Sequence, residues 1–370
     1  MGAVLVFGLS RSGLASIELL QREGLEVFCW DDDRIRFESS KLPSGVRALD
    51  GGLAKAKERG VALAVLSPGI APDSSGMKSL ESQGIPCISE LELAWRYSQS
   101  PCVIVTGTNG KSSAVSLIHS LFEAAGLKTR LCGNIGIPFS RVVAETKSKV
   151  EDSLDWYVVE ASSYQLALSP SLHPKVMVYT NFAEDHLDWH GSVDAYLRAK
   201  TDISYVLGPE DYLVYPRESS LLSKALESSA AQRLTFGLSS SGAHVELNDS
   251  LARLKSKSFD LELDSPSIGL SYQWRPLSSS LQICVSLAEI MGFDQETLIG
   301  GLRSFKPLEH RLEYAGSIGR IEFINDSKAT NVDATAYALR MCKAPMVLLL
   351  GGKHKGVSYR PFSHQRSKRS

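Results

Sequence analysis

Short apolar runs alternate with segments of helical period through the first half of the chain. Runs of strand character occupy residues 4–7, 27–30, 62–66, 103–105, 156–159 and 176–179. Between them, residues 14–20 and 114–125 repeat apolar side chains at the spacing of an amphipathic helix. This alternation predicts an α/β protein with parallel sheets whose strands are joined by crossover helices. Ligands of such sheets bind beyond the carboxyl ends of the strands, so the residues that follow each strand are the candidates for chemistry.

Two interruptions divide this pattern. Polar residues and a proline at 97–101 follow a helix-like segment, and a second break at 305–307 follows the helical pattern that covers 281–291. A chain of 370 residues ordinarily forms two or three domains. We predict three domains, with boundaries at 1–98, 99–304 and 305–370.

The last third of the chain is less regular. Apolar runs at 321–324 and 346–350 predict two strands, and the basic stretch after residue 360 predicts a solvated tail rather than a nucleic-acid contact. The serine-rich stretch 217–280 has weak periodicity, so it predicts no definite topology.

Composition narrows the possible ligands. The 40 basic and 41 acidic side chains nearly cancel, so no overall field would attract nucleic acid or an anionic membrane, and we expect neither as a partner. The six cysteines are scattered and lack C-x-x-C spacing, which argues against disulfides and a zinc site and favours a reducing compartment. No apolar stretch approaches the length of a membrane span. We therefore expect a cytoplasmic protein that binds any anion locally, and we expect it to be a monomer.

The run Gly107-Thr-Asn-Gly-Lys-Ser112 is the strongest chemical signal. It joins a predicted strand to a predicted helix, and glycines there allow the backbone to approach a phosphate at the helix N-terminus. Lys111 would meet the outer phosphates and Ser112 would reach Mg²⁺. The longer form of this loop has a further glycine where Val105 stands, so a glycine turn with a solvent-facing lysine remains the alternative.

Glu160 and His186 each come just past a predicted strand. We expect both at the sheet edge from which Lys111 emerges, where a carboxylate and an imidazole could complete the shell of Mg²⁺ ions that neutralise a nucleotide's phosphates. A purely structural role for either side chain is the alternative.

The first strand is followed by Gly8-Leu-Ser-Arg-Ser-Gly13, which is similar to a dinucleotide-binding loop except that Ser10 replaces its second glycine. Asp31 follows the next strand, where a carboxylate could accept a hydrogen bond from a ribose or uracil group. A solvated acidic turn is an equally good interpretation of Asp31.

Two later runs join cations to small polar residues. Arg311 could stabilise charge on a transferring phosphoryl group, and Lys328 could hold a carboxylate or an acyl phosphate. Lys200, on a helix-like segment, is by itself interpreted as a surface lysine.

Six motifs taken together resemble the Mur ligases, and among them the members that add D-glutamate. The motifs are Gly107-Thr-Asn-Gly-Lys-Ser112, Gly133-Asn-Ile-Gly136, Glu160-Ala-Ser-Ser-Tyr-Gln165, Glu184-Asp-His-Leu-Asp188, His310-Arg311 and Asn325-Asp-Ser-Lys-Ala-Thr-Asn331. The resemblance covers residues 3 to about 358. It implies a Rossmann-like first domain that binds the UDP-substrate, a central P-loop ATPase-like domain with a parallel sheet, and an incomplete Rossmann-like third domain.

The resemblance also implies the reaction. Its substrates would be ATP, UDP-N-acetylmuramoyl-L-alanine and D-glutamate, with Mg²⁺, and its product would be an amide formed through an acyl phosphate in peptidoglycan synthesis. An alternative from the same family likeness is a folylpolyglutamate synthase, which would need a pterin site in place of the uridine crevice.

Site residues are transferred from the resemblance position by position. ATP would be held by Gly107, Thr108, Asn109, Gly110, Lys111, Ser112, Ser113, Arg311 and Asp326. Substrate would be bound by Ser12, Asp31 and Gly69 at the uridine nucleotide, by Asn134 and Ser162 at the muramoyl-alanine portion, and by Lys328, Thr330 and Lys355 at the acyl phosphate and D-glutamate. His186 would contact both metal and substrate. Metal would be bound by Ser112, Glu160, His186 and a carbamylated Lys200. The catalytic set would be Lys111, Glu160, His186, Lys200 and Lys328.

The sequence departs from the family pattern in two places. The stretch 275–282 lacks the His-Asn pair and the further Asn that contact adenine in the family. The third domain stops soon after its second predicted strand, so we expect a truncated or frame-shifted product with an exposed, aggregation-prone sheet edge. The alternative function is therefore an inactive remnant that binds nucleotide or nucleotide-sugar without ligation.

Overall fold

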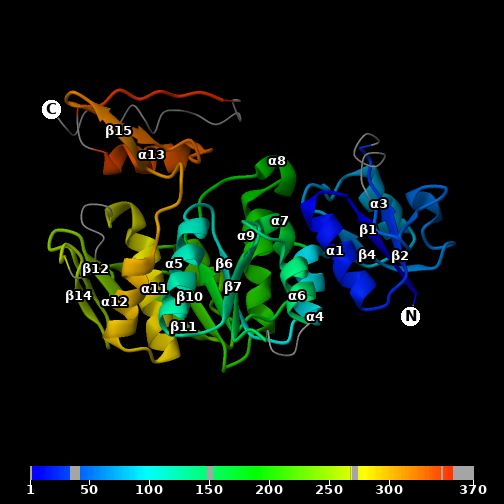
Figure 1. The fold of residues 1–370 in the computed structure, drawn as a ribbon, viewed down its shortest axis with the longest axis horizontal. Coiled ribbons are helices and arrows are strands. Elements are labelled where there is room, and N and C mark those ends of the chain that lie inside the picture. Colours follow the sequence, from blue (N-terminus) through cyan, green and yellow to red (C-terminus); the bar gives the residue numbers. More distant parts are fainter. Residues whose placement is uncertain are drawn as a thin grey trace.

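The computed structural model describes residues 2–33, 42–147, 153–266, 268, 274–342 and 345–352. Three α/β parts follow one another along the chain, and Figure 1 shows the first at one end of the molecule and the third above the helices of the second. Lys355 and the basic tail lie outside the described residues.

The first part is a parallel sheet in the order β3-β2-β1-β4-β5. Its strands are β1 Ala3–Phe7, β2 Val27–Trp30, β3 Arg47–Ala48, β4 Val61–Leu66 and β5 Cys87–Ser89. Its helices are α1 Arg11–Arg22, η1 Leu53–Lys55, α3 Ser75–Ser82 and α4 Glu90–Tyr97. The strand order reverses between β1 and β4, which is where such a sheet opens a crevice for ligands.

The central part is a larger sheet in the order β14-β13-β12-β11-β10-β9-β6-β8-β7. Its strands are β6 Cys102–Thr106, β7 Thr129–Gly133, β8 Trp156–Glu160, β9 Val176–Tyr179, β10 Tyr212–Pro216, β11 Gln232–Leu238, β12 Val245–Asn248, β13 Arg253–Lys255 and β14 Asp260–Glu262. Strands β6 to β12 run parallel to one another. Strand β13 pairs antiparallel with β12 and with β14. The stretch without a definite predicted topology thus supplies the last four strands.

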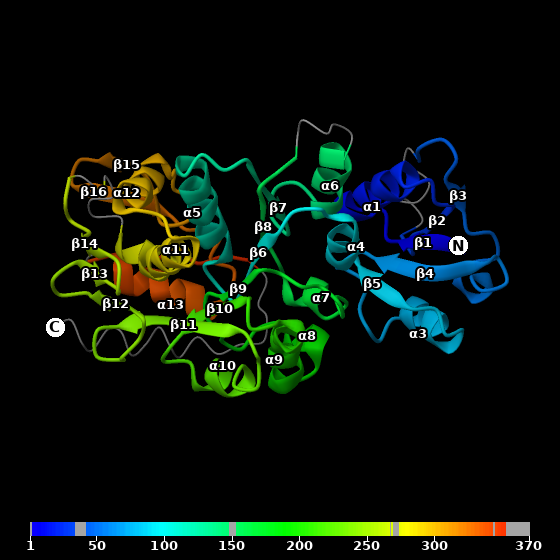
Figure 2. The same ribbon diagram turned by 90° about the horizontal axis from the view of Figure 1, so that it is seen from below.

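Helices cover both faces of the central sheet, as the view in Figure 2 shows. They are α5 Lys111–Ala124, α6 Phe139–Lys147, α7 Ser163–Leu166, α8 Leu187–His190, α9 Val193–Thr201, η3 Asp202–Val206, α10 Ser220–Ala225, η5 Arg275–Leu277, α11 Ser278–Met291 and α12 Gln295–Ser304. Helix α5 packs against α11 and α12, and the apolar side chains Val115, Ile118 and Phe122 are fully buried there. Burying this face anchors α5, so its N-terminus has a fixed place at the sheet edge.

The first and central parts meet through helices α1, α4 and α6. Glu90 is buried at this contact, where its carboxylate accepts hydrogen bonds from Ser140 N and Oγ, each at 2.6 Å. Burial raises the pKa of Glu90 above its ordinary value, and the two hydrogen bonds oppose that shift. The contact therefore joins the two sheets by a polar anchor within an apolar layer.

The third part is an antiparallel pair, β15 Glu313–Ile318 and β16 Ile321–Asn325, followed by α13 Val332–Met341. The predicted strand at 346–350 is wrong: these residues have no regular secondary structure, and Val347 and Leu349 are 90% and 89% exposed. A strand exists only through hydrogen bonds to a neighbour, and the described residues place no strand beside this run.

Candidate active site

The turn between β6 and α5 has the geometry of an anion-binding loop. Gly107 has a φ of +143°, and a Cβ added there would overlap Thr180 Oγ1. Gly110 is the left-handed N-cap of α5, with a φ of +81°. Only glycine fits such positions readily. The free amide groups of the first turn of α5 therefore open onto the loop.

The loop is held by the residues that follow the adjacent strand β9. Asn181 Oδ1 accepts hydrogen bonds from Thr108 N at 3.1 Å and Asn109 N at 2.9 Å, and Asn181 Nδ2 donates to Asn109 O at 2.9 Å. Thr180 Oγ1 donates to the same carbonyl at 2.6 Å. Because the turn is fixed by these bonds, its backbone is preorganised for a ligand.

Lys111 lies inside the loop. Its Nζ donates to Gly107 O and Thr108 O, each at 2.9 Å. Burial lowers its pKa, Glu160 opposes that shift, and Arg311 adds to it. The solvent-facing alternative for Lys111 is therefore wrong.

Lys200 is only 2% exposed, so its interpretation as a surface lysine is also wrong. Its Nζ donates to Gly107 O at 3.0 Å and lies 4.7 Å from the centre of the Tyr196 ring. Burial lowers the pKa of Lys200 well below its ordinary value, and the neighbouring Lys111 lowers it further. A lowered pKa makes it easier for this amine to lose its proton, and an amine without its proton is nucleophilic.

Glu160 is the last residue of β8 and pairs in register with Val105 of the neighbouring strand β6. The carboxylate is 2% exposed; its Oε1 accepts a hydrogen bond from Asn134 Nδ2 at 2.8 Å, whereas Oε2 is buried with no hydrogen-bond partner. A buried carboxylate oxygen without a partner lowers the stability of the fold unless a cation or a hydrogen-bond donor interacts with it. This oxygen, beside Lys111 and the phosphate loop, fits a cation held jointly with nucleotide phosphates.

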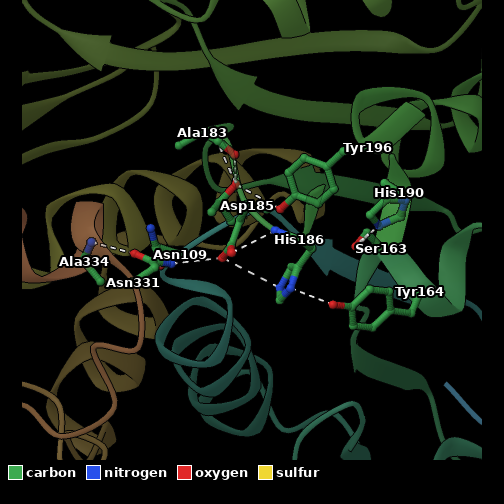
Figure 3. A network of polar contacts seen from close by, with 12 residues as sticks. Asn109, Ser163, Tyr164, Ala183, Asp185, His186, His190, Tyr196, Asn331 and Ala334 are labelled. Atoms are coloured by element: carbon green, nitrogen blue, oxygen red, sulfur yellow. Dashed lines mark hydrogen bonds and ion pairs between the residues drawn. The ribbon is translucent and has the colours of Figure 1, made fainter. Parts of the chain in front are cut away.

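His186 lies between Tyr164 and Asp185, as Figure 3 shows. Its Nδ1 is 2.6 Å from the hydroxyl of Tyr164, and its backbone N donates to Asp185 Oδ1 at 2.9 Å. His186 has a φ of 53°, a conformation that few non-glycine residues adopt and that is concentrated at functional sites. Burial raises the pKa of Tyr164 to about 12, so the phenol stays protonated.

Arg311 reaches this cluster from the third part. Its Nη2 donates to Ser112 Oγ at 3.2 Å, across 199 residues of sequence. The residues on either side, His310 and Leu312, have φ values of 65° and 47°, and Asp326 Oδ1 accepts a hydrogen bond from Leu312 N at 3.1 Å. Burial raises the pKa of Asp326. Asp326 thus holds the backbone that aims Arg311.

A second group lies at the switch point of the first sheet. Asp31 is 7% exposed, and its Oδ2 accepts a hydrogen bond from Leu9 N at 2.6 Å. Ser10 Oγ lies 3.3 Å from both Ser12 Oγ and Ser67 Oγ, and Gly69, in the turn that begins at the buried Ser67, is exposed. The solvated-turn interpretation of Asp31 is therefore wrong, because its carboxylate orders the loop after β1.

The two groups are connected through the turn after β7. Arg11 Nη1 donates to Gly136 O at 3.3 Å, and Asn134, in the same turn, contacts Glu160. Ser162 closes a capping box with Gln165 at the start of α7. Lys328 and Thr330 are exposed in the loop between β16 and α13.

Several residues of the cluster were not predicted from the sequence. They are Thr180, Asn181 and Asp185 after β9, Tyr164, His190 and Tyr196 around His186, and Asn331 at the start of α13. Thr180, Asn181 and Asp185 directly follow a strand whose carboxyl end lies at the site, so their position was a usable signal. Asn331 closes the motif Asn325-Asp-Ser-Lys-Ala-Thr-Asn331, but its partners lie in distant parts of the chain, so the sequence did not indicate them.

Two searches of the described residues set limits. No group of three or more His, Cys, Asp or Glu side chains in them could hold a metal ion alone, so a cation here would need hydroxyl or phosphate ligands as well. No helix within the described ranges is long and apolar enough to cross a membrane. Among the described residues, Cys29, Cys87, Cys102, Cys132 and Cys284 are free thiols.

Comparison with known proteins adds relatives that cover nearly all of the chain. The family models described as "Mur ligase MurD-like, N-terminal domain" and "Mur ligase middle domain" match residues 2–89 and 105–275. A UDP-N-acetylmuramoylalanine–D-glutamate ligase of Pelotomaculum thermopropionicum is 35% identical, over 98% of this chain and 79% of the relative. The enzyme of the same name from Shouchella clausii is 33% identical, over 96% of this chain and 78% of the relative.

Solved structures agree on the fold. A murein peptide ligase from Psychrobacter arcticus superposes with a TM-score of 0.54 at 14% identity, over 92% of this chain and 75% of that one. The UDP-N-acetylmuramate–alanine ligase of Thermotoga maritima gives 0.53 at 17% identity, over 92% and 77%.

Proposed function

This chain belongs to the Mur ligase family, and on that premise we propose that it joins D-glutamate to UDP-N-acetylmuramoyl-L-alanine in an ATP-dependent step of peptidoglycan synthesis. The observation that carries the proposal is the meeting at one sheet edge of a phosphate loop, a buried carboxylate oxygen without a hydrogen-bond partner, and the buried Lys200, whose pKa is lowered by burial. Relatives named for this reaction match nearly the whole chain. The remnant that binds without ligation is not favoured.

We assign ATP to the loop from Gly107 to Ser113. Backbone amides at the start of α5 and the ammonium of Lys111 would hold the phosphates, and Arg311 would reach the γ-phosphate from the third part, which its bond to Ser112 supports. Asp326 would act by holding the backbone next to Arg311.

Mg²⁺ would be held by Ser112, Glu160, His186 and Lys200 once Lys200 is carbamylated. The lowered pKa of Lys200 supports this, because a neutral amine can add carbon dioxide and so become a carboxylate-like ligand. When bound, the cation would neutralise charge on the phosphates and polarise the attacked group.

The second substrate would enter from the first sheet. Ser12, Asp31 and Gly69 would contact its uridine nucleotide, and Asn134 and Ser162 its muramoyl-alanine portion, which the Arg11 to Gly136 contact supports. The terminal carboxylate would then lie near Glu160 and attack the γ-phosphorus, forming an acyl phosphate and releasing ADP.

The amine of D-glutamate would attack the acyl carbon and expel phosphate, giving the amide. Lys328 and Thr330, which face solvent in the loop before α13, would contact the acyl phosphate and the incoming amino acid, with Lys355. The breaks between α4 and β6 and after α12 support our domain boundaries at 98/99 and 304/305. We further propose a cytoplasmic monomer, and the scattered cysteines without C-x-x-C spacing support that compartment.

One assay tests the proposal. Purified protein is incubated with ATP, Mg²⁺, UDP-N-acetylmuramoyl-L-alanine and labelled D-glutamate, and phosphate and labelled amide are measured. We expect both in equal amounts. Nucleotide-sugar binding with neither product would refute ligation and restore the remnant, and phosphate without amide would refute the second half-reaction.

A further inference from the structure

Asn331 makes contacts that no other residue of the third part duplicates among the described residues. Its Oδ1 accepts a hydrogen bond from Ala334 N at 2.8 Å and so caps helix α13. Its Nδ2 donates to Asn109 Oδ1 and to Asp185 Oδ2, each at 3.1 Å. Figure 3 shows this amide between the two acceptors.

The two acceptors belong to the two loops that build the active site. Asn109 is part of the phosphate loop, and Asp185 accepts the backbone N–H of His186. A primary amide has two N–H donors and one carbonyl. In Asn331 both donors serve the central part and the carbonyl serves α13, so one side chain ties three elements together.

We propose that Asn331 is a positioning residue that sets the third part on the central part by engaging the phosphate loop and the His186 loop at once. This inference rests on the proposed function. Two other residues of the third part depend on Asn331 for their position. Arg311 donates to Ser112, and Lys328, three residues before Asn331, donates its backbone N–H to His310 O. Without the bridge, neither cation keeps its register against the phosphate loop.

The cap and the bridge can be separated by mutation. Aspartate caps helices as well as asparagine does, but it has no N–H to donate. Asn331→Asp therefore retains the cap on α13, removes both donors, and places a carboxylate opposite Asp185. A merely structural role as a helix cap predicts little change, whereas a bridging role predicts a large one.

The experiment compares Asn331→Asp, Asp185→Asn and the double variant. We expect Asn331→Asp to keep its melting temperature and to lose about 30-fold in kcat, with a smaller change in the KM for ATP, since each hydrogen bond to a charged group is worth roughly a factor of ten or more. In the double variant the amide introduced at position 185 can donate to the carboxylate at 331. At least a tenfold recovery over Asn331→Asp is expected.

Asp294→Asn is the matched control. Asp294 caps α12 through Thr297 N at 2.8 Å and contacts neither loop, so exchanging acid and amide there should leave kcat unchanged. Equal losses of kcat in Asp294→Asn and Asn331→Asp would overturn the proposal. It would also be overturned by a double variant that recovers neither kcat nor the protection of backbone amides from hydrogen exchange.

Hydrogen exchange separates this inference from the function itself. In Asn331→Asp, with no substrate present, we expect faster amide exchange at residues 107–110 and 185–190 and unchanged exchange in α13. If the wild-type protein had no ligase activity, the proposed function would be refuted. The exchange rates at residues 107–110 and 185–190 would still test whether Asn331 bridges the two loops. Because Asp185 lies beside His186, recovery of protection in the double variant decides the case if Asp185→Asn alone lowers activity.

Discussion

Gly107→Ala should destabilise the central part and remove ATP binding together. The φ of +143° is unfavourable for alanine, and such strain costs on the order of 1–3 kcal/mol. The new Cβ would also overlap Thr180 Oγ1 and lie 3.1 Å from Thr180 Cβ, and overpacking of this kind adds roughly 1–3 kcal/mol. We therefore expect a loss of about 2–6 kcal/mol in the free energy of unfolding.

Thr180 cannot move away freely, because its hydroxyl donates to Asn109 O. The clash is thus relieved by displacing the phosphate loop, which turns a packing defect into a binding defect. Chemical denaturation followed by circular dichroism measures the loss of stability, and calorimetric titration with ATP and Mg²⁺ measures the loss of ATP binding. We expect no detectable ATP binding at concentrations that saturate the wild type.

Gly126→Ala is the matched control, since its φ is +76° and an added Cβ there meets nothing within 4 Å. It should lose only the backbone part, about 1–2 kcal/mol, with normal ATP affinity. If Gly107→Ala were no less stable than Gly126→Ala, or bound ATP normally, the steric reasoning would be refuted.

Three further outcomes follow from the buried charges. Glu160→Gln retains an acceptor for Asn134 but removes the buried carboxylate oxygen that has no hydrogen-bond partner, so the free energy of unfolding should stay the same or rise slightly. We expect kcat to fall at least about 100-fold and no longer to respond to Mg²⁺. A variant with normal kcat would contradict a role in metal binding. Lys200→Met should abolish a ¹³C carbamate signal that we expect after incubation with labelled bicarbonate, and a signal that persists in the variant would place the carbamate elsewhere. Burial, then Lys200, lowers the pKa of His190 from 6.5 to about 4, so its contribution to stability is complete above pH 6.5 and is lost as pH falls toward 4. His190→Gln, which can still donate to Ser163 Oγ, should flatten that part of the pH-stability curve, and an unchanged curve would show that His190 is not its source.

The resemblance to a family was available from the sequence, and so was the placement of the candidate loops. Short continuous apolar runs predicted β1, β2, β4, β6, β8 and β9 within a residue or two. Parallel strands must put their carboxyl ends at one edge, so the sequence alone was enough to place Lys111, Glu160 and His186 near one another. The motifs after those strands carried the relation to the ligases.

Burial and long-range partners were decided by the tertiary structure alone. Periodicity could not show that Lys200 is enclosed, because its helix has polar neighbours in sequence and only the packing of Tyr196 and the phosphate loop removes it from water. It also could not join Asn331 to Asp185, 146 residues away, or Arg311 to Ser112. The apolar run at 346–350 has strand composition, but the part of the chain that the structure describes places no strand beside it, so its sequence did not decide its structure. Local sequence sets the preference of a segment, whereas pKa shifts, bridges and strand pairing depend on which distant atoms the fold brings within a few ångströms.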